Sequence, residues 1–296
     1  MAVRVAINGF GRIGRLVLRA ILESGRSDVQ VVGINDLGSA EMNAHLLKYD
    51  SVHGILTNDI SVDGNIMEAG TGPIKVTSER DPVNLPWSEL GVEVAMECTG
   101  LFVDRKNASK HLEAGARKVL ISAPGKDSDN TIVYGVNHET LTVDHSIVSN
   151  ASCTTNCLAP VADILNKAVG IEKGFMTTVH AYTGDQPVLD TIHEGPRRAR
   201  AAGQSMIPAS TGAAKAVGLV LPELNGKLDG TAVRVPTPNV SMIDLTFSSS
   251  SETSADEINA AIKEASKGPM EGILTYNDAP LVSTDFNHNP ASSNFD

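Results

Sequence analysis

Cys153 is the residue of this sequence whose surroundings best suit a covalent nucleophile. It lies in the segment NASCTTNC at residues 150–157, which is predicted to open a helix close to Ser152. A thiol in the first helical turn faces the positive end of the helix dipole, which lowers its pKa and raises its thiolate fraction. The polar neighbours also lack the apolar wall that keeps most buried cysteines inert. Position and composition alone leave two alternatives open, a reactive thiol and a packed one.

A nucleophilic cysteine needs a base or a cationic partner, and His180 is the candidate. It follows the apolar run from Phe175 to Val179, which predicts a strand whose end lies at the rim of a sheet. The other histidines lie in polar or turn-like surroundings without such a run before them. An isolated histidine is more often structural than catalytic, so that alternative stays open for His180.

The other two cysteines are predicted to be structural. Cys157 falls on the apolar face of the helix expected after Ser152, and Cys98 ends a predicted strand beside threonine and glycine. Cysteines four residues apart could also hold a metal, but no further cysteine or histidine lies nearby to complete a zinc site. Three cysteines are too few, and odd in number, for a disulfide framework. We therefore expect neither a metal site nor disulfides.

A glycine-rich turn near the N-terminus predicts a dinucleotide site. Gly9, Gly11 and Gly14 match G-x-G-x-x-G between an apolar strand and a helix, where they allow close approach to a pyrophosphate at the helix N-terminus. Asp36 ends the next predicted strand, 36 − 14 = 22 residues after the last glycine, where a carboxylate can take the ribose hydroxyls. The alternative is a structural glycine turn with a loop aspartate. Because Asp36 would repel a 2′-phosphate and neutral residues follow it, NAD is favoured over NADP.

Composition and charge narrow the partners. The 296 residues hold 24 Lys and Arg against 35 Asp and Glu, a net charge of −11, which disfavours nucleic acid and anionic membranes. Individual arginines could still hold a small anion. The apolar run that a signal peptide needs is interrupted at the N-terminus by Arg4, Arg12 and several glycines. No segment approaches the roughly 18 consecutive apolar residues of a membrane-spanning helix. A cytoplasmic protein without a nucleic-acid or membrane partner is expected.

The elements that must position these residues alternate in type over the first half. Short apolar runs at 3–7, 29–34, 92–96 and 119–122 predict strands, with helices at 13–21 and around 108–114. Strands alternating with helices predict an α/β fold with a parallel sheet, as in Rossmann-type NAD-binding domains. The buried stripe of the first helix is expected to comprise Ile13, Leu16, Val17, Ala20 and Ile21.

The second half is predicted to be an α+β unit. Strands are expected at 175–180, 231–235 and 240–247, and residues 254–257 have the spacing of a helix capping box. Arg234 interrupts an apolar strand, where a charge is costly without a partner, so we expect it to face a site. Two domains are expected, residues 1–151 for NAD and residues 152–296 for catalysis.

Taken together, these segments resemble one enzyme family. INGFGRIG at 7–14, IND at 34–36, NASCTTNC at 150–157, TTVHAYTGDQ at 177–186 and STGAAKAVG at 210–218 are similar to phosphorylating glyceraldehyde-3-phosphate dehydrogenase of the bacterial glycolytic type. The resemblance covers essentially the whole chain. It implies a Rossmann-type domain followed by a catalytic domain with a mostly antiparallel sheet. It also implies a homotetramer, with an S-shaped loop over residues 182–203 at its interfaces.

The resemblance implies an activity and assigns roles. D-glyceraldehyde 3-phosphate would be oxidised with NAD and inorganic phosphate to 1,3-bisphosphoglycerate, with Cys153 as the nucleophile and His180 as its ion-pair partner and general base. The positions matching NAD contacts are Gly9, Gly11, Arg12, Ile13, Gly14, Asp36, Arg80 and Ser122. The positions matching substrate and phosphate contacts are Ser152, Thr154, Thr183, Arg200, Thr211, Gly212 and Arg234. Arg200 is chosen from an arginine cluster by alignment alone, and a solvated surface charge is the alternative for both arginines.

The resemblance also leaves departures and rivals. The family continues beyond Asp296 through a strand and a C-terminal helix, and its asparagine that contacts the nicotinamide carboxamide lies there, so a C-terminally incomplete sequence is expected. Glu194-Gly195-Pro196 departs from the usual loop pattern. One rival is erythrose-4-phosphate dehydrogenase, which shares NASCTTNC but diverges after the histidine and at STGAAK. The other is a catalytically silent NAD-binding remnant, against which the retained Cys153 and His180 argue.

Overall fold

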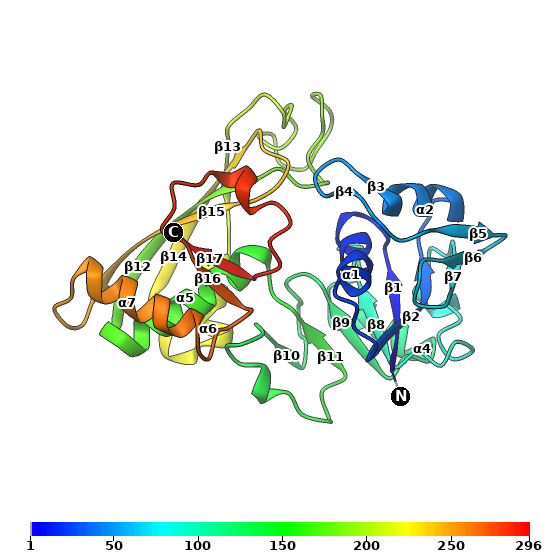
Figure 1. Ribbon diagram of the computed structural model, residues 1–296, viewed down its shortest axis with the longest axis horizontal. Helices are drawn as coiled ribbons and strands as arrows, with labels where there is room; N and C mark the ends of the chain where they lie inside the picture. Colours follow the sequence, from blue (N-terminus) through cyan, green and yellow to red (C-terminus); the bar gives the residue numbers. More distant parts are fainter. Residues whose placement is uncertain (1) are drawn as a thin grey trace. The chain divides into compact units, whose positions relative to one another are not determined.

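The computed structural model describes residues 2–296, which form two compact units (Figure 1). The first unit comprises residues up to 131 together with 141–151, and the second comprises 132–140 together with 152–296. The expected division at residue 152 placed residues 132–140 in the first domain, whereas in the structure they cluster with the second unit. This segment belongs to the second unit because it packs there: Gly135, at a φ of 86°, lies against Ile273.

A nine-stranded sheet forms the framework of the first unit, in the order β10-β11-β9-β8-β1-β2-β7-β6-β5 (Figure 1). Its strands are β1 (Val3–Asn8), β2 (Val29–Asn35), β5 (Ser61–Asp63), β6 (Ile66–Glu68), β7 (Pro73–Thr77), β8 (Val94–Glu97), β9 (Lys118–Ile121), β10 (Asn130–Thr131) and β11 (Ile147–Ser149). All neighbours from β10 to β7 run parallel, whereas β5 and β6 extend the β7 edge as antiparallel strands. The predicted parallel sheet is confirmed. Its strand order reverses at β1, which lies between β2 and β8, and ligands of such sheets bind at this reversal.

Helices and turns cover the sheet of the first unit. They are α1 (Arg12–Glu23), α2 (Ala40–Lys48), α3 (Arg105–Ala108), α4 (Lys110–Glu113), the small pair β3 (Tyr49–Asp50) and β4 (Gly54–Ile55), and 3₁₀ turns such as Pro82–Asn84. Side chains alternate along β1, so that Val5 and Ile7 pack with Leu18 of α1, while Ala6 packs in a second cluster with Trp87. Both faces of the central strands are therefore buried, as parallel strands require.

The buried face of α1 differs from the expected stripe. Leu18 and Arg19 are buried, whereas Ile13 and Ala20 are exposed. The Arg19 guanidinium donates at 2.9 Å to two carbonyls of the β3–β4 turn and pairs with Glu23 at 2.8 Å. The buried face of α1 thus includes Arg19, whose charge is paired, at a position outside the expected apolar stripe.

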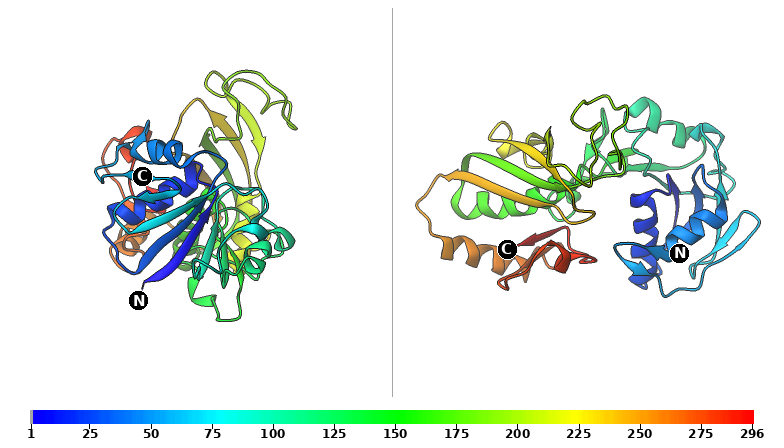
Figure 2. Two further views of the ribbon diagram at one scale, coloured as in Figure 1. Left: turned by 90° about the vertical axis from the view of Figure 1, so that its right-hand side faces the viewer. Right: turned by 90° about the horizontal axis from the view of Figure 1, so that it is seen from above.

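The second unit is built on a four-stranded sheet in the order β13-β14-β12-β15 (Figure 2). Its elements are α5 (Cys153–Val169), β12 (Ile171–Ala181), β13 (Ile207–Ser210), α6 (Ala213–Val220), β14 (Leu228–Val235), β15 (Met242–Ser249), α7 (Ala255–Ser266), β16 (Leu274–Tyr276) and β17 (Ser293–Phe295), with 3₁₀ turns at His138–Thr140, Pro222–Leu224 and Ser283–Phe286. β12 and β14 run parallel, and the other two pairs are antiparallel, so the mostly antiparallel sheet is confirmed. The Ser254–Glu257 capping box at α7 is confirmed as well.

Two further features of the chain follow from these elements. Between β12 and β13, residues 182–206 form neither helix nor strand, over the range where the S-shaped loop was expected. Within residues 2–296, no helix is both long and apolar enough to cross a bilayer.

The corrected face of α1 predicts a difference between two leucine-sized side chains. Leu18→Ala should lower the free energy of unfolding by about 3 kcal/mol, because it leaves a cavity at a fully buried position. Ile13→Ala should cost less than about 1 kcal/mol, because Ile13 is 49% exposed. Differential scanning calorimetry of the nucleotide-free protein measures both. A loss for Ile13→Ala as large as that for Leu18→Ala would contradict the exposure of Ile13.

Candidate active site

The structure brings Cys153 and His180 into direct contact. Cys153 is the first residue of α5, whose N-cap Ser152 accepts a hydrogen bond from the Thr155 N–H at 3.0 Å. His180 lies at the end of β12, with its Nε2 atom 3.2 Å from the Cys153 sulfur. Cys153 is exposed and His180 is only 6% exposed, so a substrate can approach the sulfur while the imidazole stays fixed.

Hydrogen bonds at the far side of the imidazole define its tautomer. Nδ1 of His180 lies 2.7 Å from the carbonyl oxygen of Ala181, a closer contact than the 3.1 Å to the Arg234 guanidinium, so we assign the ring proton to Nδ1. Arg234 Nη1 donates to the same carbonyl at 3.0 Å and lies 3.1 Å from Nδ1. In the neutral ring the lone pair is then on Nε2, which faces the sulfur. This nitrogen can take a proton from the thiol or from a hydroxyl formed beside it.

The three cysteines differ in the pKa of their thiols. Although Cys153 is accessible, the protein atoms beside its sulfur displace water and so raise the pKa of the thiol, but the hydrogen bond and charge of His180, aided by Thr154, outweigh this, and the net shift is downward. Burial raises the pKa of Cys157, and Ser293 at 3.5 Å offsets this only in part. Burial also raises the pKa of Cys98, to about 11. The thiolate is therefore favoured at Cys153 alone among the three.

A cluster of anion-binding groups surrounds the imidazole. Arg234 Nη1 donates at 3.0 Å to the hydroxyl of Thr183, which in turn donates to Asp185. Arg198 pairs with the same carboxylate at 3.1 Å. Burial lowers the pKa of Arg234, with the Arg198 charge acting in the same direction, and its buried Nε has no hydrogen-bond partner. An incoming phosphate oxygen would satisfy that N–H group.

The N-termini of α5 and α6 lie together in the same unit. The Thr155 hydroxyl donates at 3.2 Å to the carbonyl of Ala213, the first residue of α6. Thr211 accepts from the Ala213 N–H at 3.1 Å, and the space beside Gly212 is open. Thr154 follows the nucleophile, with its hydroxyl 4.0 Å from the sulfur. The predicted positions Ser152, Thr154, Thr211 and Gly212 therefore all lie at adjoining helix N-termini, which favour anions.

Arg200 is not brought into this arrangement. It is 67% exposed at its side chain and pairs with Asp190 at 2.6 Å. Arg198, which was not among the predicted positions, contacts Thr183 through Asp185, while the predicted role of Arg200 stays a prediction. The sequence offered three arginines within four residues, and only the position of Asp185 in space distinguishes among them.

The glycine turn of the first unit fits a dinucleotide. A Cβ at Gly14 would lie 2.1 Å from the carbonyl oxygen of Gly9, so this turn tolerates only glycine there. The space beside Gly11 is open, which leaves the backbone accessible to a ligand. The Asp36 carboxylate accepts from the N–H groups of Phe10 and Gly38, both at 2.9 Å, and so lies against the turn.

The remaining predicted NAD positions lie in the first turn of α1 or shortly after strands of the same sheet. Arg12 pairs with Asp50, and its buried Nη2 has no hydrogen-bond partner, as expected of a group that awaits an anion. Ile13 is exposed in the first turn of α1, Arg80 is exposed after β7, and Ser122 follows β9. The residues present therefore fit NAD. Among residues 2–296, no three His, Cys, Asp or Glu side chains gather into a metal-binding group.

A parallel-sheet unit with this glycine turn, together with a thiol–imidazole pair in a second unit, defines an NAD-dependent dehydrogenase with a cysteine nucleophile. Residues 3–105 match the family model described as the NAD-binding domain of glyceraldehyde 3-phosphate dehydrogenase, and residues 152–296 match that of its C-terminal domain. The chain belongs to the glyceraldehyde-3-phosphate dehydrogenase family.

Curated relatives agree with this assignment. The chain is 65% identical to glyceraldehyde-3-phosphate dehydrogenase of Xanthobacter flavus, 61% to that of Cereibacter sphaeroides and 57% to glyceraldehyde-3-phosphate dehydrogenase 1 of Bacillus subtilis. Each match covers 100% of this chain and 88% of the relative.

The hydrogen bond between Cys153 and His180 predicts how the reactivity of the three thiols depends on pH. In the native protein, Cys153 should be alkylated by iodoacetamide at a lower pH than Cys98 or Cys157, because His180 favours its thiolate. His180→Gln should raise the pKa of Cys153, since it removes the stabilising charge while leaving burial in place. Peptide mass spectrometry of samples alkylated across a pH series measures each site. An unchanged Cys153 profile in the His180 variant would contradict the pairing.

The different surroundings of Arg198 and Arg200 predict different effects on the KM values when each is replaced. Arg198→Gln should raise the KM for inorganic phosphate or for the phosphorylated aldehyde by about tenfold, because it removes a charge from the Asp185–Thr183–Arg234 cluster. Arg200→Gln is the matched control and should change either KM less than about twofold, since exposed ion pairs contribute little. Steady-state kinetics decide between them, and the reverse order would assign the site to Arg200.

Proposed function

We propose that this protein oxidises and phosphorylates D-glyceraldehyde 3-phosphate to 1,3-bisphosphoglycerate with NAD and inorganic phosphate, as a glycolytic glyceraldehyde-3-phosphate dehydrogenase. The observation that carries the proposal is the 3.2 Å contact between the Cys153 sulfur and His180 Nε2. The family membership supports the same reaction. The relatives' names favour it over erythrose-4-phosphate dehydrogenase, and the intact thiol–imidazole pair argues against a silent remnant.

The first step uses the thiolate. The Cys153 thiolate, whose population its lowered pKa increases, attacks the aldehyde carbon, and the imidazolium of His180 protonates the resulting oxygen to give a hemithioacetal. His180 Nε2 then takes the proton of the hemithioacetal hydroxyl, because the Nδ1–H bond to Ala181 leaves Nε2 as the basic nitrogen. NAD, when bound, supplies the hydride acceptor. Cys153 is left as a thioester.

The second step releases the product from Cys153. Inorganic phosphate attacks the thioester, and the sulfur leaves as a thiolate that the imidazolium of His180 stabilises. Two phosphate groups are present at this stage, one on the substrate and one attacking. Arg234, Thr183, Arg198 and the N-termini of α5 and α6 supply the donors for them.

We further propose that Gly9, Gly11, Arg12, Ile13, Gly14, Asp36, Arg80 and Ser122 hold NAD. The orphaned Nη2 of Arg12 and the open space at Gly11 support a pyrophosphate at the turn. Asp36 has both carboxylate oxygens at the turn for the ribose hydroxyls.

A homotetramer in the cytoplasm completes the proposal. The loop over residues 182–206 exposes Val188, Leu189, Ile192 and Met206, each more than 70% accessible. Apolar side chains gathered on one loop favour burial against another copy of the chain. Analytical ultracentrifugation tests the assembly, and a monomer at micromolar concentration would contradict it.

The activity is tested by following NADH absorbance with the aldehyde, with and without inorganic phosphate. Sustained turnover should require phosphate. Cys153→Ser should lower kcat on the order of 10⁴-fold, because the nucleophile is lost. Cys157→Ser, one helical turn away with a raised thiol pKa, is the control and should retain most of the activity. A rate independent of Cys153 would refute the mechanism, and faster turnover of erythrose 4-phosphate would assign the other substrate.

A further inference from the structure

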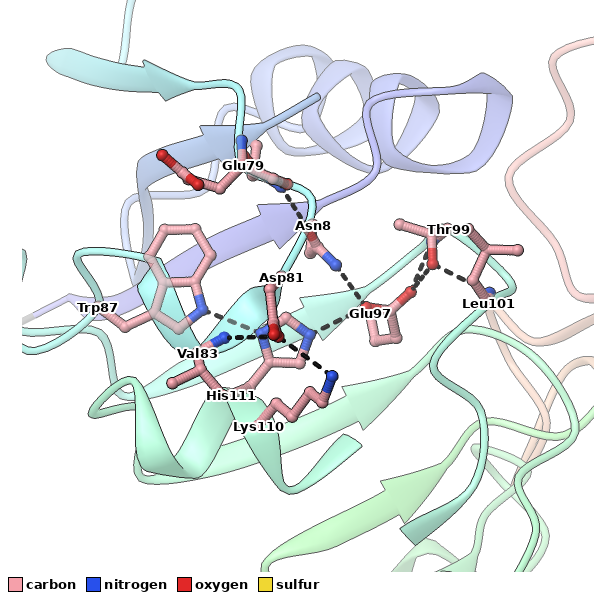
Figure 3. A network of polar contacts seen from close by, with 11 residues as sticks. Asn8, Glu79, Asp81, Val83, Trp87, Glu97, Thr99, Leu101, Lys110 and His111 are labelled. Carbon is pink, nitrogen blue, oxygen red and sulfur yellow. Dashed lines mark hydrogen bonds and ion pairs between the residues drawn. The ribbon is translucent and has the colours of Figure 1, made fainter. Parts of the chain in front are cut away.

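Glu97, the last residue of β8, is a fully buried carboxylate that the reaction above does not use. Its Oε1 accepts hydrogen bonds from the N–H of Thr99, at 2.8 Å, and from the Thr99 hydroxyl (Figure 3). Its Oε2 accepts from Asn8 Nδ2 at 2.6 Å and contacts His111 Nε2 at 2.9 Å. A buried carboxylate is tolerated as an anion when donors saturate it, as four do here.

The imidazole of His111 beside Glu97 carries no positive charge that would neutralise the carboxylate. The indole N–H of Trp87 can only donate, and it lies 3.1 Å from Nδ1 of His111, so Nδ1 is the acceptor (Figure 3). Nε2 of His111 therefore carries the ring proton and donates it to Glu97. His111 is the neutral donor, and Glu97 is an isolated anion inside the first unit.

This charge lies at one end of a hydrogen-bonded ladder across four neighbouring strands. Asn8, Asn35 and Thr77 are the last residues of β1, β2 and β7, and their registers place each beside the next. Because Glu97 only accepts, Asn8 presents its NH₂ group to it and its Oδ1 to Asn35, whose Nδ2 donates at 2.7 Å. Asn35 Oδ1 then accepts from the Thr77 hydroxyl at 3.0 Å and from the Glu79 N–H at 2.8 Å. These side-chain bonds from one strand end to the next all point toward Glu97, while Asn35 Nδ2 also donates to the Glu79 carbonyl at 2.9 Å.

The loops that follow these strand ends carry the proposed NAD residues. Gly9 follows Asn8, Asp36 follows Asn35, and Arg80 lies one residue after the anchored Glu79. Thr99, held by Glu97, also backs the glycine turn, because a Cβ at Gly9 would lie 2.7 Å from the Thr99 N–H nitrogen. The anion orients the Asn8 amide, which in turn faces its Oδ1 to Asn35, and the backbone of Glu79 holds the Asn35 amide from its other side.

We propose that Glu97 is a positioning residue for NAD, whose buried charge orients the Asn8 amide at the head of the Asn8–Asn35–Thr77 ladder and, through Asn8 and Thr99, holds the nucleotide turn in its binding conformation. The inference rests on the proposed NAD site. It differs from a purely structural role, because a positioning role requires NAD affinity to fall by more than general loss of stability explains.

The test compares NAD affinity with stability in three variants. Glu97→Gln keeps the side-chain shape but brings an NH₂ group to face donors, which breaks the single direction of the ladder. Its NAD Kd, measured by isothermal titration calorimetry, should rise by about 10- to 100-fold, as for a lost charged hydrogen bond. Trp87→Phe removes the indole donor behind His111 and leaves a small cavity at a fully buried position, without touching Glu97 or the ladder directly. It should lower the melting temperature of the nucleotide-free protein and change the NAD Kd less than about twofold.

Asn35→Leu is the third variant and carries the test if Glu97→Gln does not fold. It breaks the ladder between β1 and β7 while leaving the four donors of Glu97 in place, and it should also weaken NAD about tenfold. Wild-type affinity in Glu97→Gln or in folded Asn35→Leu would overturn the inference. So would a loss of affinity in Trp87→Phe that matches theirs at an equal loss of melting temperature.

Failure of the underlying site is recognised separately. Asp36→Ala should weaken NAD in its own right, through the ribose contact. If the unmodified protein does not bind NAD, or Asp36→Ala binds it unchanged, the proposed NAD site is wrong. If both behave as expected while the ladder variants bind normally, only the role of Glu97 fails.

Discussion

The contact between the Cys153 sulfur and His180 Nε2 is the interaction on which the proposed chemistry of this protein depends. Cys153 is the first residue of α5 and His180 is the penultimate residue of β12, so regular secondary structure holds both partners. The N-cap at Ser152 fixes where α5 begins, and the Ala181 carbonyl fixes which imidazole nitrogen faces the sulfur. Ala151, with a φ of 56°, turns the chain into the helix in a conformation that alanine rarely adopts. Strain of this kind persists where the surrounding structure holds a site in place.

Positive charge close to this pair serves two purposes. The Arg234 guanidinium shares the Ala181 carbonyl with His180 and therefore helps to hold the ring, while it also binds the Thr183 hydroxyl. Asp185 keeps the cluster from being purely cationic, and the Thr183 hydroxyl and the nearby arginines lower the pKa of its carboxyl against the effect of burial. Without this carboxylate, Arg198 and Arg234 would repel each other in a partly dehydrated space. A balanced cluster can bind a phosphate dianion and release it again.

Sequence reasoning succeeded where the signal is local. Gly9, Gly11, Gly14 and Asp36 are recognisable because a tight turn between a strand and a helix restricts residue type within a short window. Sequence patterns say less where partners are distant along the chain. The pairing of Arg198 with Asp185 is visible only in the folded loop, and Glu97 carries no motif because its partner Asn8 is 89 residues away. Arg19 was not among the residues expected in the buried stripe, since the carbonyls that bury it belong to a turn 34 and 35 residues later.

Buried polar groups that already have hydrogen-bond partners belong to residues proposed to position ligands, whereas buried groups without partners belong to residues proposed to bind them. Glu97 has a donor for every direction of its carboxylate, so it gains nothing from a ligand and can only hold its neighbours. Arg12 Nη2 and Arg234 Nε are buried without partners, and each belongs to a cation at a proposed anion site. Leaving a charged donor unpaired costs stability in the free protein, and that cost is recovered when a phosphate oxygen arrives. The same energy that destabilises the empty site therefore becomes part of the binding energy for NAD in one unit and for phosphate in the other.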